Sequence, residues 1–231
     1  MVDGALSFTA AARPARAPLA GARIRLEPLA AEHHGRALFA ASHGPGADPA
    51  LWRYLPYGPF ADPDGFVAWL SGLERSEDPL FFALVETAAG RPLGVAAYLR
   101  IAPEHGCIEI GHIWLGAELQ RTAAATEAMY LLARQAFETL GNRRLEWKCD
   151  AANGRSRRAA ERLGFTFEGV FRQHMIVKGR NRDTAWFSLL DSEWPAARAA
   201  FEAWLAPANF DADGRQRRPL SALIESERAA R

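Results

Sequence analysis

The amino-acid sequence predicts an α/β fold, because strand and helix patterns alternate through its central part. Polar and apolar residues alternate over residues 107–115, which is typical of a β-strand. Apolar residues recur at helical spacing over 120–140, and a second alternating run, 145–150, leads into another helix. These segments form a βαβα unit within residues 107–165, and the other elements are arranged around it.

Before this unit we expect a terminal arm, a strand, two helices and a hairpin. Residues 1–21 are rich in Ala, Pro and Arg without a sustained period, so the arm should be disordered or packed loosely. Asp62 as N-cap, followed by Pro63, predicts the start of the second helix. Apolar spacing predicts the remaining elements, which are a strand at 23–28, a helix at 30–41 and hairpin strands at 80–86 and 93–101.

After the unit we expect a second hairpin, a helix and a tail. Residues 166–178 and 183–190 alternate as strands on either side of the turn 179–182. Residues 192–205 have the spacing of an amphipathic helix. The composition of residues 206–231 predicts a polar tail.

Composition excludes several classes of partner. The 231 residues carry 28 basic and 27 acidic side chains, a net charge of +1, so the overall charge attracts neither nucleic acid nor a membrane surface. Cys107 and Cys149 have no spacing typical of disulfides or metal sites, and no cluster of His, Cys, Asp or Glu predicts a metal. The sequence shows neither a signal peptide nor an apolar membrane span, so we expect a reduced, cytoplasmic protein.

Small residues follow the strand at 107–115 where the next helix should begin. They let a ligand approach backbone N–H groups, and a helix N-terminus attracts phosphate through its free donors and dipole. We therefore expect a phosphate site at Gln120, Arg121, Thr122, Ala123, Ala124, Ala125 and Thr126.

The strand at 107–115 carries two candidate catalytic side chains. Period two places Glu109 and His112 on opposite faces, so we do not expect them to form a contacting pair. Glu109 is either a general base or a carboxylate paired with an arginine. His112 is either a core histidine with satisfied hydrogen bonds or a catalytic residue, with the core role favoured.

Four motifs in order resemble one family. They are Glu-Ile-Gly-x-x-Trp-Leu from Glu109, Gln-x-x-Ala-x-Ala-Thr-Glu-Ala from Gln120, Asn153-x-x-Ser156, and Glu-Arg-Leu-Gly-Phe ending at Phe165. Together they resemble the GNAT acyl-CoA N-acyltransferases, in particular the RimJ/RimL-like branch that acetylates ribosomal-protein N-termini. The likeness spans roughly residues 22–190. It implies one domain over 22–205, with a mixed, mostly antiparallel sheet of about seven strands and helices on both faces.

The resemblance implies acetyl-CoA as the acyl donor, without a metal, and a role for each motif. Backbone groups of Ile113 and Trp114 would bind the pantetheine arm and the thioester carbonyl, and the loop from Gln120 would hold the pyrophosphate. Asn153 would contact the pantetheine amide. Ser156 would lie near the sulfur. Because Ala160 stands where many members have a tyrosine, either Ser156 or a water would protonate the departing thiolate.

The sequence departs from the family at Ala123, where glycine is usual. A Cβ there is acceptable only if the residue has helical φ and ψ.

The helix with Arg155, Arg157, Arg158 and Arg162 has either a solvated basic face or contacts to the nucleotide 3′-phosphate or an acidic partner. We assign Arg158 to the cofactor.

The acceptor should be a small-molecule amine or a protein N-terminus, with Glu109 and Asp150 as candidate bases. Its pocket should lie between an aromatic loop and the second hairpin, because loops held by a rigid scaffold carry most binding residues. The side chains assigned to it are Trp52, Tyr54, Tyr57, His174 and Trp186.

Two rival functions remain, and the oligomeric state stays open, with a homodimer as one alternative. A non-catalytic acyl-CoA-binding or sensor protein is suggested by Ala123 and Ala160. A nucleic-acid-binding module on the arginine-rich helix is disfavoured by the net charge.

Overall fold

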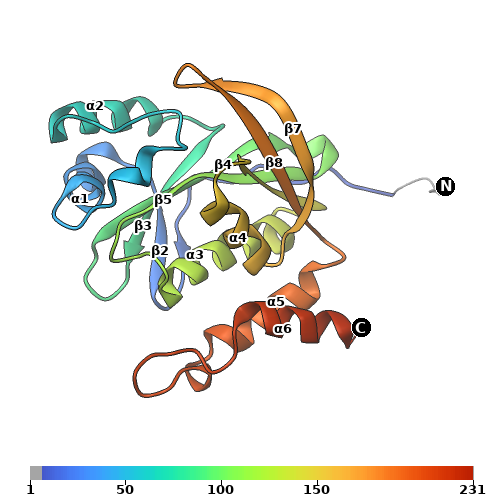
Figure 1. The fold of residues 1–231 in the computed structure, drawn as a ribbon. Helices are drawn as coiled ribbons and strands as arrows, with labels where there is room; N and C mark the ends of the chain where they lie inside the picture. Colours follow the sequence, from blue (N-terminus) through green and yellow to red (C-terminus); the bar gives the residue numbers. More distant parts are fainter. Residues whose placement is uncertain (1–6, 231) are drawn as a thin grey trace.

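The computed structural model describes residues 7–230, which form an eight-stranded sheet with helices on both faces (Figure 1). The strand order is β1-β2-β3-β4-β5-β6-β8-β7, and β5 and β6 form the parallel pair of this otherwise antiparallel sheet. The expected mixed, mostly antiparallel α/β fold is confirmed. The strands are β1 (Leu19–Ala20), β2 (Ile24–Pro28), β3 (Leu80–Glu86), β4 (Pro92–Ala102), β5 (Cys107–Leu115), β6 (Arg144–Asp150), β7 (Thr166–Val177) and β8 (Arg180–Leu190).

Two apolar cores lie on opposite faces of the sheet. One is formed with the helices that precede β3, and includes Phe66, Leu70 and Trp114. The larger one is formed with the four later helices, and includes Leu132 and Phe201. The helices are α1 (Ala31–His43), α2 (Pro63–Leu73), α3 (Ala123–Arg134), α4 (Gly154–Arg162), α5 (Trp194–Leu205) and α6 (Leu220–Ala229).

β5 and β6 separate halfway along their length. They pair from Cys107 against Arg144 to Ile110 against Trp147, and no pairing follows Ile110. At the same point β5 contains a β-bulge. Gly111 pairs with Ala97 and Trp114 pairs with Val95, so β5 advances three residues where β4 advances two, and His112 has a φ of 51°. The two strands therefore open into a V where their carboxyl ends lie.

The bulge corrects the expectation that Glu109 and His112 lie on opposite faces. Ile110 packs in the core beneath α3, whereas Trp114 packs in the core beneath α1 and α2. Strict alternation would have put both on one face, so one extra residue lies between them. His112 stacks on Phe81 of the α1–α2 core, and it thus shares the face that carries Glu109. Alternation in sequence contains no signal for one inserted residue.

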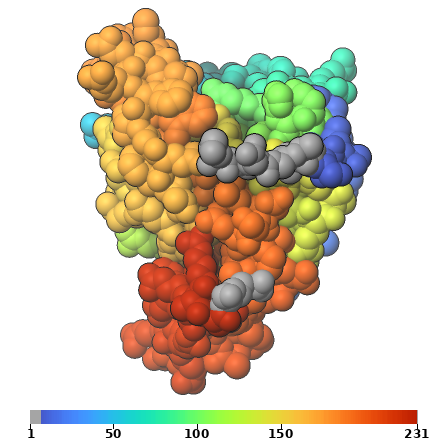
Figure 2. Space-filling model, turned by 90° about the vertical axis from the view of Figure 1, so that its right-hand side faces the viewer, coloured from blue at the N-terminus to red at the C-terminus, as the bar shows by residue number. Residues whose placement is uncertain are grey.

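The expected polar tail, residues 206–231, is instead packed structure over its described part, residues 206–230. It contains α6, whose Leu220, Leu223 and Ile224 are buried against the body. Figure 2 shows this segment, in red, lying against α5 at the end of the molecule away from the β7–β8 hairpin. The three apolar residues have helical i, i+3, i+4 spacing, which the surrounding charges mask.

The expected arm, residues 1–21, follows the body over its described part. The N–H of Ala11 donates to Pro103 O, that of Ala12 donates to Leu140 O, and β1 extends the sheet beside β2. The first six residues lie outside the described part. Among residues 7–230, no helix combines the length and apolar character needed to cross a membrane.

Candidate functional site

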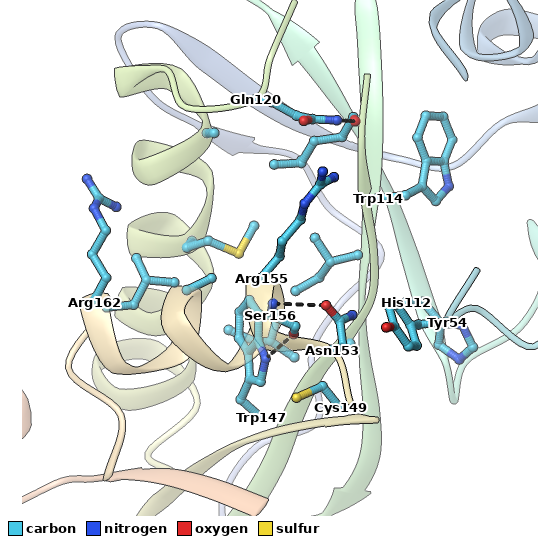
Figure 3. A pocket seen from close by; sticks show the side chains of 18 of the residues that line it. Tyr54, His112, Trp114, Gln120, Trp147, Cys149, Asn153, Arg155, Ser156 and Arg162 are labelled. Atoms are coloured by element: carbon cyan, nitrogen blue, oxygen red, sulfur yellow. Dashed lines mark hydrogen bonds between the residues drawn. The ribbon is translucent and has the colours of Figure 1, made fainter. Parts of the chain in front are cut away.

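A cavity of about 1570 Å³ occupies the V between β5 and β6 (Figure 3). It continues from the N-termini of α3 and α4 to the side of the sheet that carries Glu109, His112 and His174. One opening therefore connects the predicted phosphate loop to the predicted acceptor side.

The α3 N-terminus offers free backbone donors to this cavity. Thr122 is the N-cap, and its hydroxyl accepts from the N–H of Ala125 at 3.1 Å. Within residues 7–230, the N–H groups of Ala123 and Ala124 have no hydrogen-bond acceptor. Such unpaired donors with the positive end of the helix dipole bind anions.

The backbone at Ala123 is helical, which is the conformation that its Cβ requires. Ala123 is the first residue of α3, and the left-handed conformation falls instead on Arg121, with a φ of 61°. A Cβ at position 123 is thus unstrained. Gln120 fixes the loop by donating from Nε2 to Leu115 O at 2.9 Å. Of the predicted loop residues, Ala124 packs on the core and does not line the cavity, whereas the other six do.

The α4 N-terminus places Ser156 deep in the V. Asn153 caps the helix, its Oδ1 accepting from the N–H of Ser156 at 3.1 Å. The Ser156 hydroxyl accepts from Trp147 Nε1 at 3.0 Å, so its own proton is available to another acceptor (Figure 3). Burial raises the pKa of the neighbouring Cys149 thiol, and the Ser156 hydroxyl opposes this shift. Ala160, by contrast, is fully buried in the core.

Glu109 is held by two cations. Its Oε2 lies 2.7 Å from Arg100 Nη1 and 3.0 Å from Lys148 Nζ, and only 4% of the residue is exposed. Both ion pairs use Oε2, and Oε1 has no ion-pair partner among residues 7–230. The geometry therefore resembles the paired alternative stated above, with lysine as a second partner.

His112 is a half-buried histidine that packs against an aromatic ring. It stacks on Tyr57 with ring centroids 5.7 Å apart, and its Nδ1 lies 3.2 Å from the Tyr57 hydroxyl. Burial, followed by the charges of Arg100 and Arg182, lowers its pKa to about 4. Burial likewise raises the pKa of Tyr57, so both rings are uncharged near neutral pH.

The aromatic loop reaches the cavity with one of its three assigned rings. Tyr54 lines it and donates from its hydroxyl to Ala152 O at 3.1 Å. Trp52 is only 2% exposed and packs on Trp114 in the α1–α2 core, and Tyr57 is covered by Trp69 and His112. The expectation that Trp52 and Tyr57 form the pocket wall is corrected, because both support it from behind.

The second hairpin contributes His174 but not the Trp186 ring. His174 lines the cavity with its Nδ1 3.0 Å from Thr184 Oγ1. Trp186 is not a lining residue; Lys148 Nζ lies over its ring at 3.8 Å. Asp150, at the end of β6, lines the cavity and accepts from the N–H of Ala152 at 2.8 Å.

At the end of the cavity beside α3, the sequence offered Arg162 as one alternative for the nucleotide 3′-phosphate, but it gave no sign of Trp204 or of the residues that follow α5. Arg162 lies there, donating to Thr126 Oγ1 at 3.1 Å and stacking over Trp204 at 5.0 Å. Burial lowers the pKa of Arg162, and no carboxylate of residues 7–230 lies within ion-pair distance of it. Arg158, assigned to the cofactor, does not line the cavity. The other lining residues of this end include Arg23, Pro207, Phe210, Gly214, Arg215 and Gln216, most of them from the supposed tail.

Among residues 7–230, one group has ligand atoms close enough for a metal, namely Glu27, His33 and His34. His34 Nδ1 accepts from the N–H of Ala30, so its Nε2 carries the proton and donates to Glu27 Oε2 at 3.2 Å. Both ring nitrogens of His34 are therefore occupied, and the group fixes the start of α1.

Comparisons with known proteins match this architecture. A family model described as an acetyltransferase (GNAT) domain matches residues 23–166. The chain is 28% identical over 151 residues to the uncharacterized N-acetyltransferase p20 of Bacillus licheniformis, covering 64% of this chain and 84% of p20. It is 36% identical over 86 residues to the putative ribosomal N-acetyltransferase YdaF of Bacillus subtilis, covering 37% and 46% of the two chains. A crystal structure of a GCN5-related N-acetyltransferase from Brucella melitensis superposes with a TM-score of 0.92 at 50% identity, covering 95% of this chain and 99% of that one.

Proposed function

The chain belongs to the GNAT family of N-acetyltransferases, and we propose that it transfers acetyl from acetyl-CoA to a primary amine by direct attack in a ternary complex. The observation that carries the proposal is the single cavity that joins the free N–H groups of α3, the Ser156 hydroxyl and the acceptor side of the sheet. The RimJ/RimL-like character of the chain agrees with the name of its relative YdaF, a putative ribosomal N-acetyltransferase.

The donor's diphosphate fits the α3 N-terminus, with Arg121, Thr122 and Thr126 around it. The pantetheine arm fits the edge of β5 from residue 111 to 115, which has no strand partner on the β6 side. The nucleotide end, with its 3′-phosphate, fits Arg162 and Trp204, since a half-buried guanidinium without a carboxylate partner favours an anion and an indole ring favours a base.

The reaction needs two proton movements from this chain's residues. The amine nitrogen attacks the thioester carbon, so a C–N bond forms and the C–S bond breaks. A base removes one proton from the attacking nitrogen, and the leaving thiolate takes the Ser156 hydroxyl proton. The remaining rate acceleration comes from holding the two reactants together in the V.

We assign the base to Asp150. Three carboxylates line the cavity, and two of them are engaged: Glu109 by Arg100 and Lys148, and Asp48 by Arg155. Within residues 7–230, Asp150 alone of the three has no cation within ion-pair distance.

Asp150→Asn should lower kcat at pH 7 by about 10²–10⁴-fold, the usual contribution of a positioned base, whereas Glu109→Gln should lower it far less. The loss in Asp150→Asn should shrink as the assay pH is raised above the pKa of the acceptor amine, near 8 for an α-amine, because the amine then loses its proton without help. A kcat of Asp150→Asn within about twofold of wild type at pH 7 would mean that Asp150 is not the base.

The rival interpretation, a non-catalytic acyl-CoA-binding protein, rested on Ala123 and Ala160. The helical backbone at Ala123 accepts its Cβ, and Ser156 lies in the cavity where Ala160 does not. The deciding experiment follows thiol release from acetyl-CoA across a panel of amines and of peptides with free N-termini. Amine-dependent release supports the proposal; binding of acetyl-CoA with no amine-dependent release would support the rival.

A further inference from the structure

Arg182 is a cation without a counter-ion on the acceptor side of the cavity. It lies on β8 and lines the cavity, and its Nε is buried without a hydrogen-bond partner in the described residues. Throughout residues 7–230, no carboxylate oxygen lies within 4.0 Å of its guanidinium, whereas neighbouring Arg100 is paired to Glu109. A guanidinium that lines a cavity without a counter-ion favours an anionic ligand there.

The neighbouring charges do not neutralise Arg182. Glu109 is shared by Arg100 and Lys148, and Lys148 also pairs with Glu146 at 2.7 Å. Asp183 follows Arg182 in the chain, but its Oδ1 accepts from the N–H of Gln173 at 2.7 Å. Asp150 is the remaining carboxylate of the cavity, and it accepts from the N–H of Ala152.

Arg182 lines the same cavity as His112, Cys149 and Ser156. Its charge contributes to the lowered pKa of His112 on β5. It also opposes the raised pKa of Cys149 on β6. The guanidinium therefore acts on groups of both strands that form the V.

We propose that Arg182 binds an anionic group of the acceptor, so that the substrates are amines with a carboxylate near the reacting nitrogen. This inference rests on the proposed acetyl transfer and adds the substrate class. Arg182 would hold the carboxylate by charge-assisted hydrogen bonds while Asp150 receives the ammonium end. The carboxylate has two sources: the α-carboxylate of a free amino acid, or the side chain of an acidic residue at a peptide N-terminus.

The test uses two pairs of acceptors that differ in one negative charge. L-phenylalanine and its amide test the free α-carboxylate, and the tripeptide amides Asp-Ala-Phe and Asn-Ala-Phe test an acidic first residue. Each is assayed with wild type, Arg182→Gln and Arg180→Gln. Arg180 is an exposed arginine of the same hairpin that does not line the cavity, so it controls for the loss of one positive charge. Comparing ratios between proteins cancels the different amine pKa values within a pair.

The measured quantity is the ratio of kcat/KM for the anionic member of a pair to kcat/KM for its neutral partner. In one pair this ratio should be at least about tenfold higher in wild type than in Arg182→Gln. Arg180→Gln should keep the wild-type ratio. The pair that responds identifies the source of the carboxylate. Equal ratios in wild type and Arg182→Gln for both pairs would overturn the proposal. An equal fall in kcat for both members would also overturn it, placing Arg182 at the thioester oxygen instead.

Calorimetry with the same pairs and CoA-loaded protein separates this inference from the proposed function. If no acceptor is acetylated, acetyl transfer fails as the function. Binding of the anionic members that Arg182→Gln weakens would still support the anion site, and binding without any charge preference would refute it.

Discussion

Replacing Ser156 with alanine is expected to lower kcat by about 10²–10⁴-fold, the usual contribution of a positioned general acid, while the Kd of acetyl-CoA stays nearly unchanged. The hydroxyl accepts from Trp147 Nε1 and keeps its own proton for the cavity. Ala160 is buried, so position 160 supplies no alternative donor. The measurement combines steady-state kinetics with calorimetry of acetyl-CoA.

A second variant separates proton donation from the structural contact with Trp147. Trp147→Phe removes the indole N–H and leaves the Ser156 hydroxyl in place, so its kcat should fall far less than that of Ser156→Ala. Similar losses in the two variants would mean that Ser156 matters through its hydrogen bond to the ring. A kcat of Ser156→Ala within about twofold of wild type would assign the proton to water.

Replacing Ala123 with glutamate is expected to weaken acetyl-CoA binding on the order of 10²-fold, or about 2.7 kcal/mol. A carboxylate at the first turn of α3 repels the diphosphate and competes for the free N–H groups of residues 123 and 124. Acidic residues near a helix N-terminus stabilise the helix by about 0.3–1 kcal/mol, so the fold should be retained.

Ala123→Gln is the control for this variant, because it adds similar bulk without charge. It should weaken binding less than Ala123→Glu, and both proteins should unfold thermally at or above the wild-type temperature. Equal, unchanged affinities of both variants for acetyl-CoA in calorimetry would contradict a diphosphate site at α3.

The sequence predicted the fold wherever local patterns decide it. Alternation identified β5 and β6, and the small residues that follow β5 marked the start of α3, whose N-cap is Thr122. The condition stated for Ala123, a helical backbone, is met because the left-handed residue is Arg121.

The remaining features depend on tertiary contacts or single insertions. A bulge in β5 moves His112 by one face, and period-two alternation carries no trace of it. Trp52 was assigned to the pocket because its loop is irregular, yet it fills the core beside Trp114. Arg162 meets Trp204 only because α5 packs beside α3, a contact between residues 42 positions apart.

The most direct test of acyl-CoA binding in the V between β5 and β6 is a crystal structure of the protein with acetyl-CoA. We expect the diphosphate against the N–H groups of Ala123 and Ala124, the thioester sulfur within hydrogen-bonding distance of Ser156 Oγ, and the adenine beside Trp204. An ordered acetyl-CoA molecule whose diphosphate lies away from residues 121–126, or whose sulfur lies outside the V, would contradict it.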